Sequence, residues 1–253
     1  MSKYTGLRYF DVDYQLVTDM SVSVEGEGID GGRNGEGDSP AIDFSGGGKV
    51  VASYGVYAVE PEQHEMLNSI AAYLGGSLRC MNVPILTDRV GPFPFLGKSD
   101  PQPIVSGIRH SDGSLFDDGA GYSQATVFAT FENAAPLNAG QVTINVFGAV
   151  RALRWSDWMS TNHETRGWRA FRYWEASDPV AVVRTVDGVS YPGQQYRLAI
   201  SPPLREAVAA GQRVELARPR FVARFPRGFN LEWTVKPPFH SQATIKFVEA
   251  EIR

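Results

Sequence analysis

Short stretches in which apolar and polar residues alternate recur along most of the chain. One of the clearest spans residues 196–200, where Arg197 and Ala199 separate three larger apolar side chains. A period of two is typical of a β-strand with one face in the core. Comparable β signals predict further strands within residues 4–24, 41–59, 78–86, 126–131, 141–147, 180–189, 228–235 and 243–248. The pattern therefore predicts an all-β fold.

One segment has helical periodicity instead. Pro61 suits the first turn of a helix, and Gly75 and Gly76 suit its end, so the spacing predicts a helix over residues 61–74. We expect its apolar face to pack on a sheet. That face consists of Met66, Leu67, Ile70, Ala71, Tyr73 and Leu74.

Residues 196–224 predict a strand, a short helix and a second strand. Ser201 can cap the helix, Pro202 or Pro203 can occupy its first turn, and Gly211 can end it. The apolar members of the second strand are Val214, Leu216, Phe221 and Val222. The unit contains no nucleophile and no metal ligands, which indicates an architectural role.

Length and composition limit the protein class. A chain of 253 residues forms one large β domain or two small ones, and its 26 glycines and 16 prolines favour a β-rich class. We expect one β domain over residues 1–100, completed by 213–253, and an inserted or appended β domain over 101–212. The Pro-rich stretch 91–103 is the best candidate for a boundary.

Charge and cysteine content narrow the environment. A net charge of −4 argues against a protein that grips nucleic-acid phosphates over a broad surface. The single cysteine, Cys80, excludes an intrachain disulfide, fits assembly in a reducing cytoplasm, and is expected to be a small buried residue. No apolar run approaches the roughly 18 residues that span a bilayer, so we expect a soluble protein.

The sequence contains only weak motifs for catalytic, cofactor-binding or metal-binding sites. Gly26, Gly28 and Gly31 match the dinucleotide fingerprint, but no predicted helix follows to hold a pyrophosphate. In the aspartate-rich loop 110–122, Asp112 is followed at once by a glycine, which breaks the calcium-loop spacing. Nucleophile-elbow, zinc-hydrolase and Cys-x-x-Cys patterns are missing. We therefore predict no enzyme activity, no cofactor and no metal.

Two segments are candidates for contacts between subunits. Residues 25–38 predict a long hairpin loop that orders against a neighbour, with Glu27, Arg33 and Asn34 as contacts. Residues 151–174 interleave arginines with four of the five tryptophans, and packing or a subunit contact is the main interpretation. Stacking of single-stranded nucleic acid or of sugars is the alternative. The tryptophans are Trp155, Trp158, Trp168 and Trp174.

The stretch Ile-Ser-Pro-Pro-Leu-Arg-Glu-Ala-Val-Ala-Ala-Gly at 200–211 resembles a signature of minor tail proteins of long-tailed bacteriophages, in particular the distal tail proteins. The loop 110–119 with Gly121 and Tyr122, and the C-terminal strand 245–250, are similar to the same pattern in the same order. The resemblance covers about half of the chain, and the Trp/Arg segment departs from it.

The resemblance implies a virion protein of the tail tip, assembled in the host cytoplasm. It implies a β-sandwich or split-barrel-like ring domain with one helix, a second small β domain, and a homohexameric ring. Such a ring connects the tail tube protein to the tail-tip hub protein of the baseplate and surrounds the DNA exit channel during genome ejection, without binding DNA specifically. The alternatives are a carbohydrate-binding β-sandwich for host glycans and, less favoured, a cell-wall hydrolase.

Overall fold

Strands dominate the structure, a computed structural model. Among the described residues, strands predominate and one helix is present, which confirms the predicted all-β fold. The structure describes residues 7–12, 16–26, 28–30, 41–43, 46–86, 128–147, 149, 151–155, 157–186, 189–216, 218–236 and 240–250.

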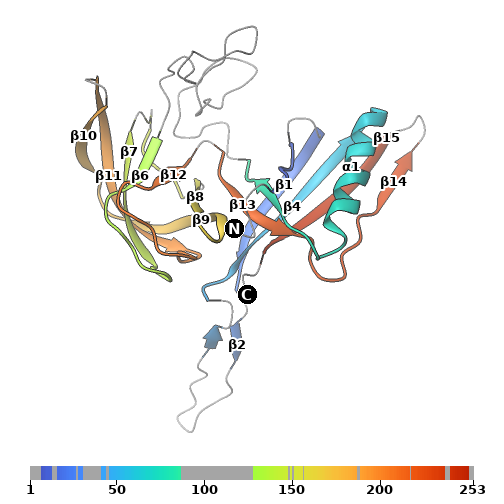
Figure 1. Cartoon of the computed structure of the whole chain (residues 1–253), viewed down its shortest axis with the longest axis horizontal. Helices are drawn as coiled ribbons and strands as arrows, with labels where there is room; N and C mark the ends of the chain where they lie inside the picture. Colours follow the sequence, from blue (N-terminus) through green and yellow to red (C-terminus); the bar gives the residue numbers. More distant parts are fainter. Residues whose placement is uncertain are drawn as a thin grey trace.

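The first sheet combines strands from both ends of the chain and is antiparallel throughout (Figure 1). Its order is β1-β4-β15-β13-β5, and β14 also pairs with β15. The strands are β1 (Leu16–Glu25), β4 (Lys49–Ala58), β5 (Met81–Pro84), β13 (Arg220–Arg224), β14 (Trp233–Lys236) and β15 (His240–Glu249).

The second sheet uses the middle of the chain, in the order β10-β11-β7-β6-β12-β8-β9. Because β9 also pairs with β11, this sheet closes into a barrel and leaves β10 outside the ring of strands. The strands are β6 (Phe128–Phe131), β7 (Gln141–Phe147), β8 (Trp158–His163), β9 (Gly167–Ala176), β10 (Val180–Val186), β11 (Val189–Ser201) and β12 (Arg213–Glu215).

The alternation in the sequence becomes an alternation of burial. Along β15, Ala243, Ile245 and Phe247 are buried and the residues between them are exposed or half-buried. The rings of Phe10, Tyr54 and Phe247 pack together with centroids 5.3–5.8 Å apart and form the centre of the first core. A separate core fills the barrel and includes Phe131, Ile144, Phe171 and Leu198.

The helix α1 (Pro61–Leu74) has the predicted bounds. The side chain of Gln63 accepts a hydrogen bond from the backbone N–H of Glu60 at 3.2 Å, and Gly75 ends the helix in the left-handed conformation, with φ 53°. Leu67, Ile70 and Leu74 are buried in the first core, whereas the other predicted apolar positions, Met66, Ala71 and Tyr73, are half-buried.

The predicted short helix after Ser201 is wrong: residues 202–212 contain no helix. The backbone N–H of Leu204 donates to the carbonyl of Ala139 at 3.1 Å, and that of Val208 donates to the carbonyl of Ala135 at 2.9 Å. Pairing with this neighbouring segment uses the amides that a helix would have bonded internally.

The single strand predicted after Gly211 is also wrong. The run contains β12, which pairs in the barrel, and β13, which pairs in the first sheet. The chain crosses between the sheets around Pro219, whose carbonyl accepts the N–H of Ile85 at 2.7 Å. A proline cannot donate to a strand ladder, so a break falls naturally here. The strand grouping therefore changes between β12 and β13, later than the predicted boundary at 212/213.

A small two-stranded ribbon is formed by β2 (Gly28–Asp30) and β3 (Ala41–Asp43), which pair antiparallel. Figure 1 shows the ribbon extending away from the two larger sheets. The Pro-rich stretch 91–103 and the aspartate-rich loop 110–122 lie outside the described residues.

Candidate functional site: the junction between the sheets

One buried carboxylate lies where the two sheets meet. Glu249, at the end of β15, is 3% exposed. Its carboxylate accepts hydrogen bonds from the backbone N–H of Val50 at 3.1 Å, from Nη1 of Arg169 at 3.2 Å and from Nε of Arg205 at 3.4 Å. A carboxylate removed from water needs such partners, because its desolvation is otherwise uncompensated.

Arg169 extends from β9 of the barrel to the last strand of the first sheet. Its side chain is almost fully buried, and Nη1 also donates to the carbonyl of Ala250 at 3.0 Å, while Nε donates to the carbonyl of Arg166 at 3.1 Å. A planar guanidinium can hold several acceptors at fixed angles. This arginine therefore fixes the barrel against β15.

Arg205 connects the same carboxylate to the base of the ribbon. Nη1 donates to the carbonyl of Gly46 at 2.8 Å, and Nη2 donates to the carbonyl of Gly48. The chain packs tightly here: a Cβ on Gly47 would lie 2.3 Å from Cδ of Pro203, and Gly47 has a φ of 94°. Only glycine fits such a backbone without strain.

The neighbouring residue, Glu206, makes contacts in another direction. Its carboxylate accepts the N–H of Thr165 at 3.2 Å, the hydroxyl of Thr165 at 2.8 Å and the N–H of Arg166 at 3.1 Å. These residues form the turn between β8 and β9. The segment 202–212 therefore contacts the ribbon base through one charged residue and the barrel through the next.

Two of the predicted contact tryptophans pack within the chain instead. Trp158 is 7% exposed and belongs to the core of the first sheet, so a contact with another subunit is not supported for this residue. Trp168 is half-buried, and the guanidinium carbon of Arg220 lies 4.4 Å from its ring centroid. This cation–π contact joins β9 to β13 across the two sheets.

The other predicted subunit contacts are either exposed to solvent or outside the described residues. Trp155 is 75% exposed and Trp174 is 64% exposed, so these two rings remain accessible. They are therefore the tryptophans that remain candidates for stacking against a sugar. Glu27, Arg33 and Asn34 lie outside the described residues. The structure does not bring the four tryptophans together into one surface, because the two packed rings and the two exposed rings have different surroundings.

A buried histidine lies close to the junction. His163, at the end of β8, is 2% exposed, and neither ring nitrogen has a hydrogen-bond partner. The pKa of His163 is lowered from 6.5 to about 4, mainly because the ring is buried; Glu206 opposes the shift, and Arg169 and Arg166 contribute to it. The ring is therefore neutral near pH 7. Of the other histidines, His64 is half-buried on α1.

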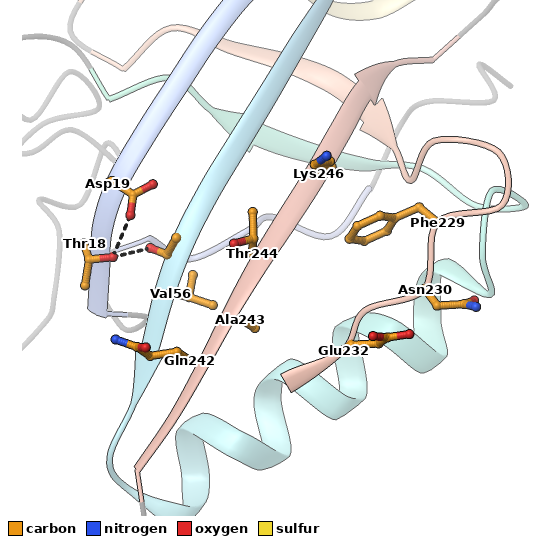
Figure 2. A pocket seen from close by; sticks show the side chains of 11 residues that line it. Thr18, Asp19, Val56, Phe229, Asn230, Glu232, Gln242, Ala243, Thr244 and Lys246 are labelled. Carbon is orange, nitrogen blue, oxygen red and sulfur yellow. Dashed lines mark hydrogen bonds between the residues drawn. The ribbon is translucent and has the colours of Figure 1, made fainter. Parts of the chain in front are cut away.

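A cleft of about 530 Å³ lies elsewhere, against β1, β4 and β15 of the first sheet. Figure 2 shows Thr18 and Asp19 on one side and Phe229, Asn230 and Glu232 on a loop at the other. The hydroxyl of Thr18 donates to Asp19 at 3.0 Å. The cleft is open, and its polar side chains are those of exposed surface residues.

Sequence reasoning missed the charged residues of the junction, although a signal was present. Glu249 falls in the same strand phase as Ile245 and Phe247, which predicts an inward-facing carboxylate. A charge in the apolar phase of a strand indicates a buried partner. Which residue supplies that partner depends on the packing of the barrel against the first sheet, which the local pattern does not specify.

No group of three or more potential metal ligands occurs among the described residues. In the same part of the chain, no helix is long and apolar enough to cross a membrane. No protein-family model matches the sequence, and no curated protein matches it either.

Proposed function

We propose that this protein is a structural virion subunit, resembling the distal tail proteins of long-tailed bacteriophages, that assembles into a closed ring. Its partners in this proposal are further copies of itself, a tail tube protein and a tail-tip hub protein. The ring surrounds the channel through which DNA leaves, and its wall passes the genome without binding it specifically. The β2–β3 ribbon makes the contact between neighbouring copies.

The observation that carries the proposal is that Arg205 donates hydrogen bonds to the base of the ribbon. Arg205 belongs to the stretch 200–211 that resembles the tail-protein signature, and it donates to the carbonyls of Gly46 and Gly48 where the ribbon joins β4. A head-to-tail ring closes only if every subunit presents its contact at the same angle. An arginine fixed by a buried carboxylate supplies that constant angle, because Glu249 holds the same guanidinium.

The main test is deletion of residues 27–37, which removes β2 and the connection that follows it. We expect the wild-type chain, concentrated and examined by mass photometry and negative-stain imaging, to form rings of about 166 kDa, six times 27.7 kDa. The deletion should leave a folded monomer, because both cores lie outside the ribbon. Rings that persist after the deletion would contradict the role of the ribbon.

A more conservative substitution tests the angle at which the ribbon is held, rather than the presence of the ribbon. Arg205→Lys keeps the charge but removes the planar fork that holds two carbonyls, so we expect a smaller fraction of rings. The matched control is Arg197→Lys, since Arg197 is exposed and bonds Gln141 at 2.8 Å on the barrel. Equal ring fractions in the two variants, or a wild-type chain without rings, would count against the proposal.

A further inference from the structure

We propose that the cleft against β1, β4 and β15 binds a short oligosaccharide, with a pyranose ring stacked on the side chain of Phe229. The cleft has a volume of about 530 Å³, and the loop between β13 and β14 forms its far wall (Figure 2). Cavities of this size commonly hold small ligands. This site is separate from the exposed tryptophans and does not depend on the ring proposed above.

The aromatic wall of the cleft is fixed by its surroundings. The N–H of Phe229 donates to the carbonyl of Pro226 at 3.1 Å, in a turn where Gly228 has a φ of 75°. The ring centroid lies 5.1 Å from that of the buried Phe225, with 67° between the ring planes. Such an edge contact holds Phe229 without covering both faces of its ring. Figure 2 shows this ring directed toward β15, so the cleft gains a flat apolar surface beside polar groups.

The floor of the cleft crosses three adjacent strands. Asp19 of β1 and Thr244 of β15 both lie opposite Gly55 of β4, one on each side. Gly55 leaves room for the carboxylate, because a Cβ at this position would lie 2.1 Å from Oδ2 of Asp19. The hydroxyl of Thr18 donates to the same carboxylate at 3.0 Å. A carboxylate held in this way still has lone pairs that can accept hydrogen bonds from neighbouring hydroxyl groups of a ligand.

The outer edge of β15 is unpaired where it borders the cleft. Among the described strands, β14 and β13 both pair with this edge, but they leave residues 244–247 between them without a partner. The N–H of Ala250 donates to the carbonyl of Val222 on this side, and every second residue of an antiparallel strand bonds in the same direction. The backbone groups of Thr244 and Lys246 therefore face the gap and add donors and acceptors to the cleft.

The lining residues favour a sugar over other ligand classes. Asp19 and Glu232 outnumber Lys246, so an anionic ligand such as a phosphate is disfavoured. The four-residue gap in β15 is closed at both ends by β13 and β14, which leaves an extended peptide no room to continue as an added strand. The amides of Asn230 and Gln242 supply both donors and acceptors. A pyranose combines an apolar C–H face, which suits an aromatic ring, with hydroxyl groups that both donate and accept.

The first test is isothermal titration and saturation-transfer NMR of the full chain with maltose, cellobiose, lactose and diacetylchitobiose. We expect at least one of these sugars to bind with a Kd of about 1 mM or below. Phe229→Leu should weaken that binding about ten-fold, because leucine keeps the contact with Phe225 but removes the flat ring. Absence of binding by all four sugars would overturn the proposal.

The second test separates the cleft from the exposed tryptophans. Asp19→Asn should weaken binding about five-fold, since a neutral acceptor replaces a charged one. Trp155→Leu and Trp174→Leu are the matched aromatic controls and should leave the Kd within about two-fold. Circular dichroism checks that every variant is folded. Loss of binding in a tryptophan variant, with unchanged affinity in Phe229→Leu and Asp19→Asn, would overturn the assignment to the cleft.

Discussion

Two regions of the first sheet carry charged residues on the same strand and use them differently. Glu249 and Lys246 lie three residues apart on β15, so their side chains point to opposite faces. Glu249 is buried between two arginines at the junction, whereas Lys246 is exposed at the edge of the open cleft. The two residues differ in strand phase, and strand phase decides whether a charge determines structure or remains available to solvent.

The contrast gives each region a distinct role. At the junction every named charge is bound to a backbone group or an opposite charge on another element, so the barrel and the first sheet have a defined mutual orientation. In the cleft the charges lie on surface residues, where ion pairs contribute little to folding.

Glu249→Gln should have the largest effect. The substitution removes the negative charge that Arg169 and Arg205 share, and breaking a buried pair in this way costs about 3–5 kcal/mol. Urea denaturation at pH 7 measures the loss. A loss below about 1 kcal/mol, the range of surface pairs, would show that the junction does not depend on this charge.

Acidification should have the next largest effect, through His163. The pKa of this residue is about 4 in the folded chain and 6.5 in an exposed histidine, so below pH 6.5 the unfolded chain binds a proton that the folded chain does not. The free energy of unfolding should therefore fall between about pH 6.5 and 4, by up to about 3 kcal/mol.

The variant His163→Gln isolates that contribution, because its side chain stays neutral at every pH. We expect the free energies of unfolding of the two chains, measured by urea denaturation at pH 7, 6, 5 and 4.5, to become more similar as the pH falls. Carboxylates titrate in the same range but contribute to both chains alike. Parallel curves would mean that the histidine does not carry the pH dependence.

Asp19→Asn and Glu232→Gln should have the smallest effects. Both side chains are exposed at the cleft, and each substitution repeats the carboxylate-to-amide change of Glu249→Gln without burial. We expect changes within about 0.5 kcal/mol in the same urea assay. A loss of several kcal/mol in either variant would remove the distinction between cleft and junction.

Much of the fold follows from local patterns in the sequence. The helix bounds agree because Pro61 and Gly75 mark both ends, and β7 agrees because its alternation is regular. The same reasoning predicts the wrong structure for residues 202–212. Their amides bond to residues 135–139, and the local pattern does not identify these partners. Tertiary pairing overrides a local helix signal when it satisfies the same backbone groups.

The junction was the least predictable part for a related reason. Strand phase indicates that Glu249 faces inward, but Arg169 and Arg205 reach it from positions 80 and 44 residues away in the chain. Composition likewise leaves packing and a subunit contact equally open for Trp158 and Trp168, because it does not distinguish a ring packed within the chain from a ring on a surface.

The pairing of β5 with β13 has a consequence for how such a chain can be rearranged. The chain leaves the first sheet after β5 and returns at β13, and these strands are direct neighbours, with Arg220 opposite Pro84. The barrel is thus attached through two adjacent points, so a gene segment coding for it could be exchanged or excised without separating the ends of the first sheet. Excision alone would leave the carboxylate of Glu249 without Arg169 and Arg205, so a viable shortened chain would also need an apolar residue at position 249.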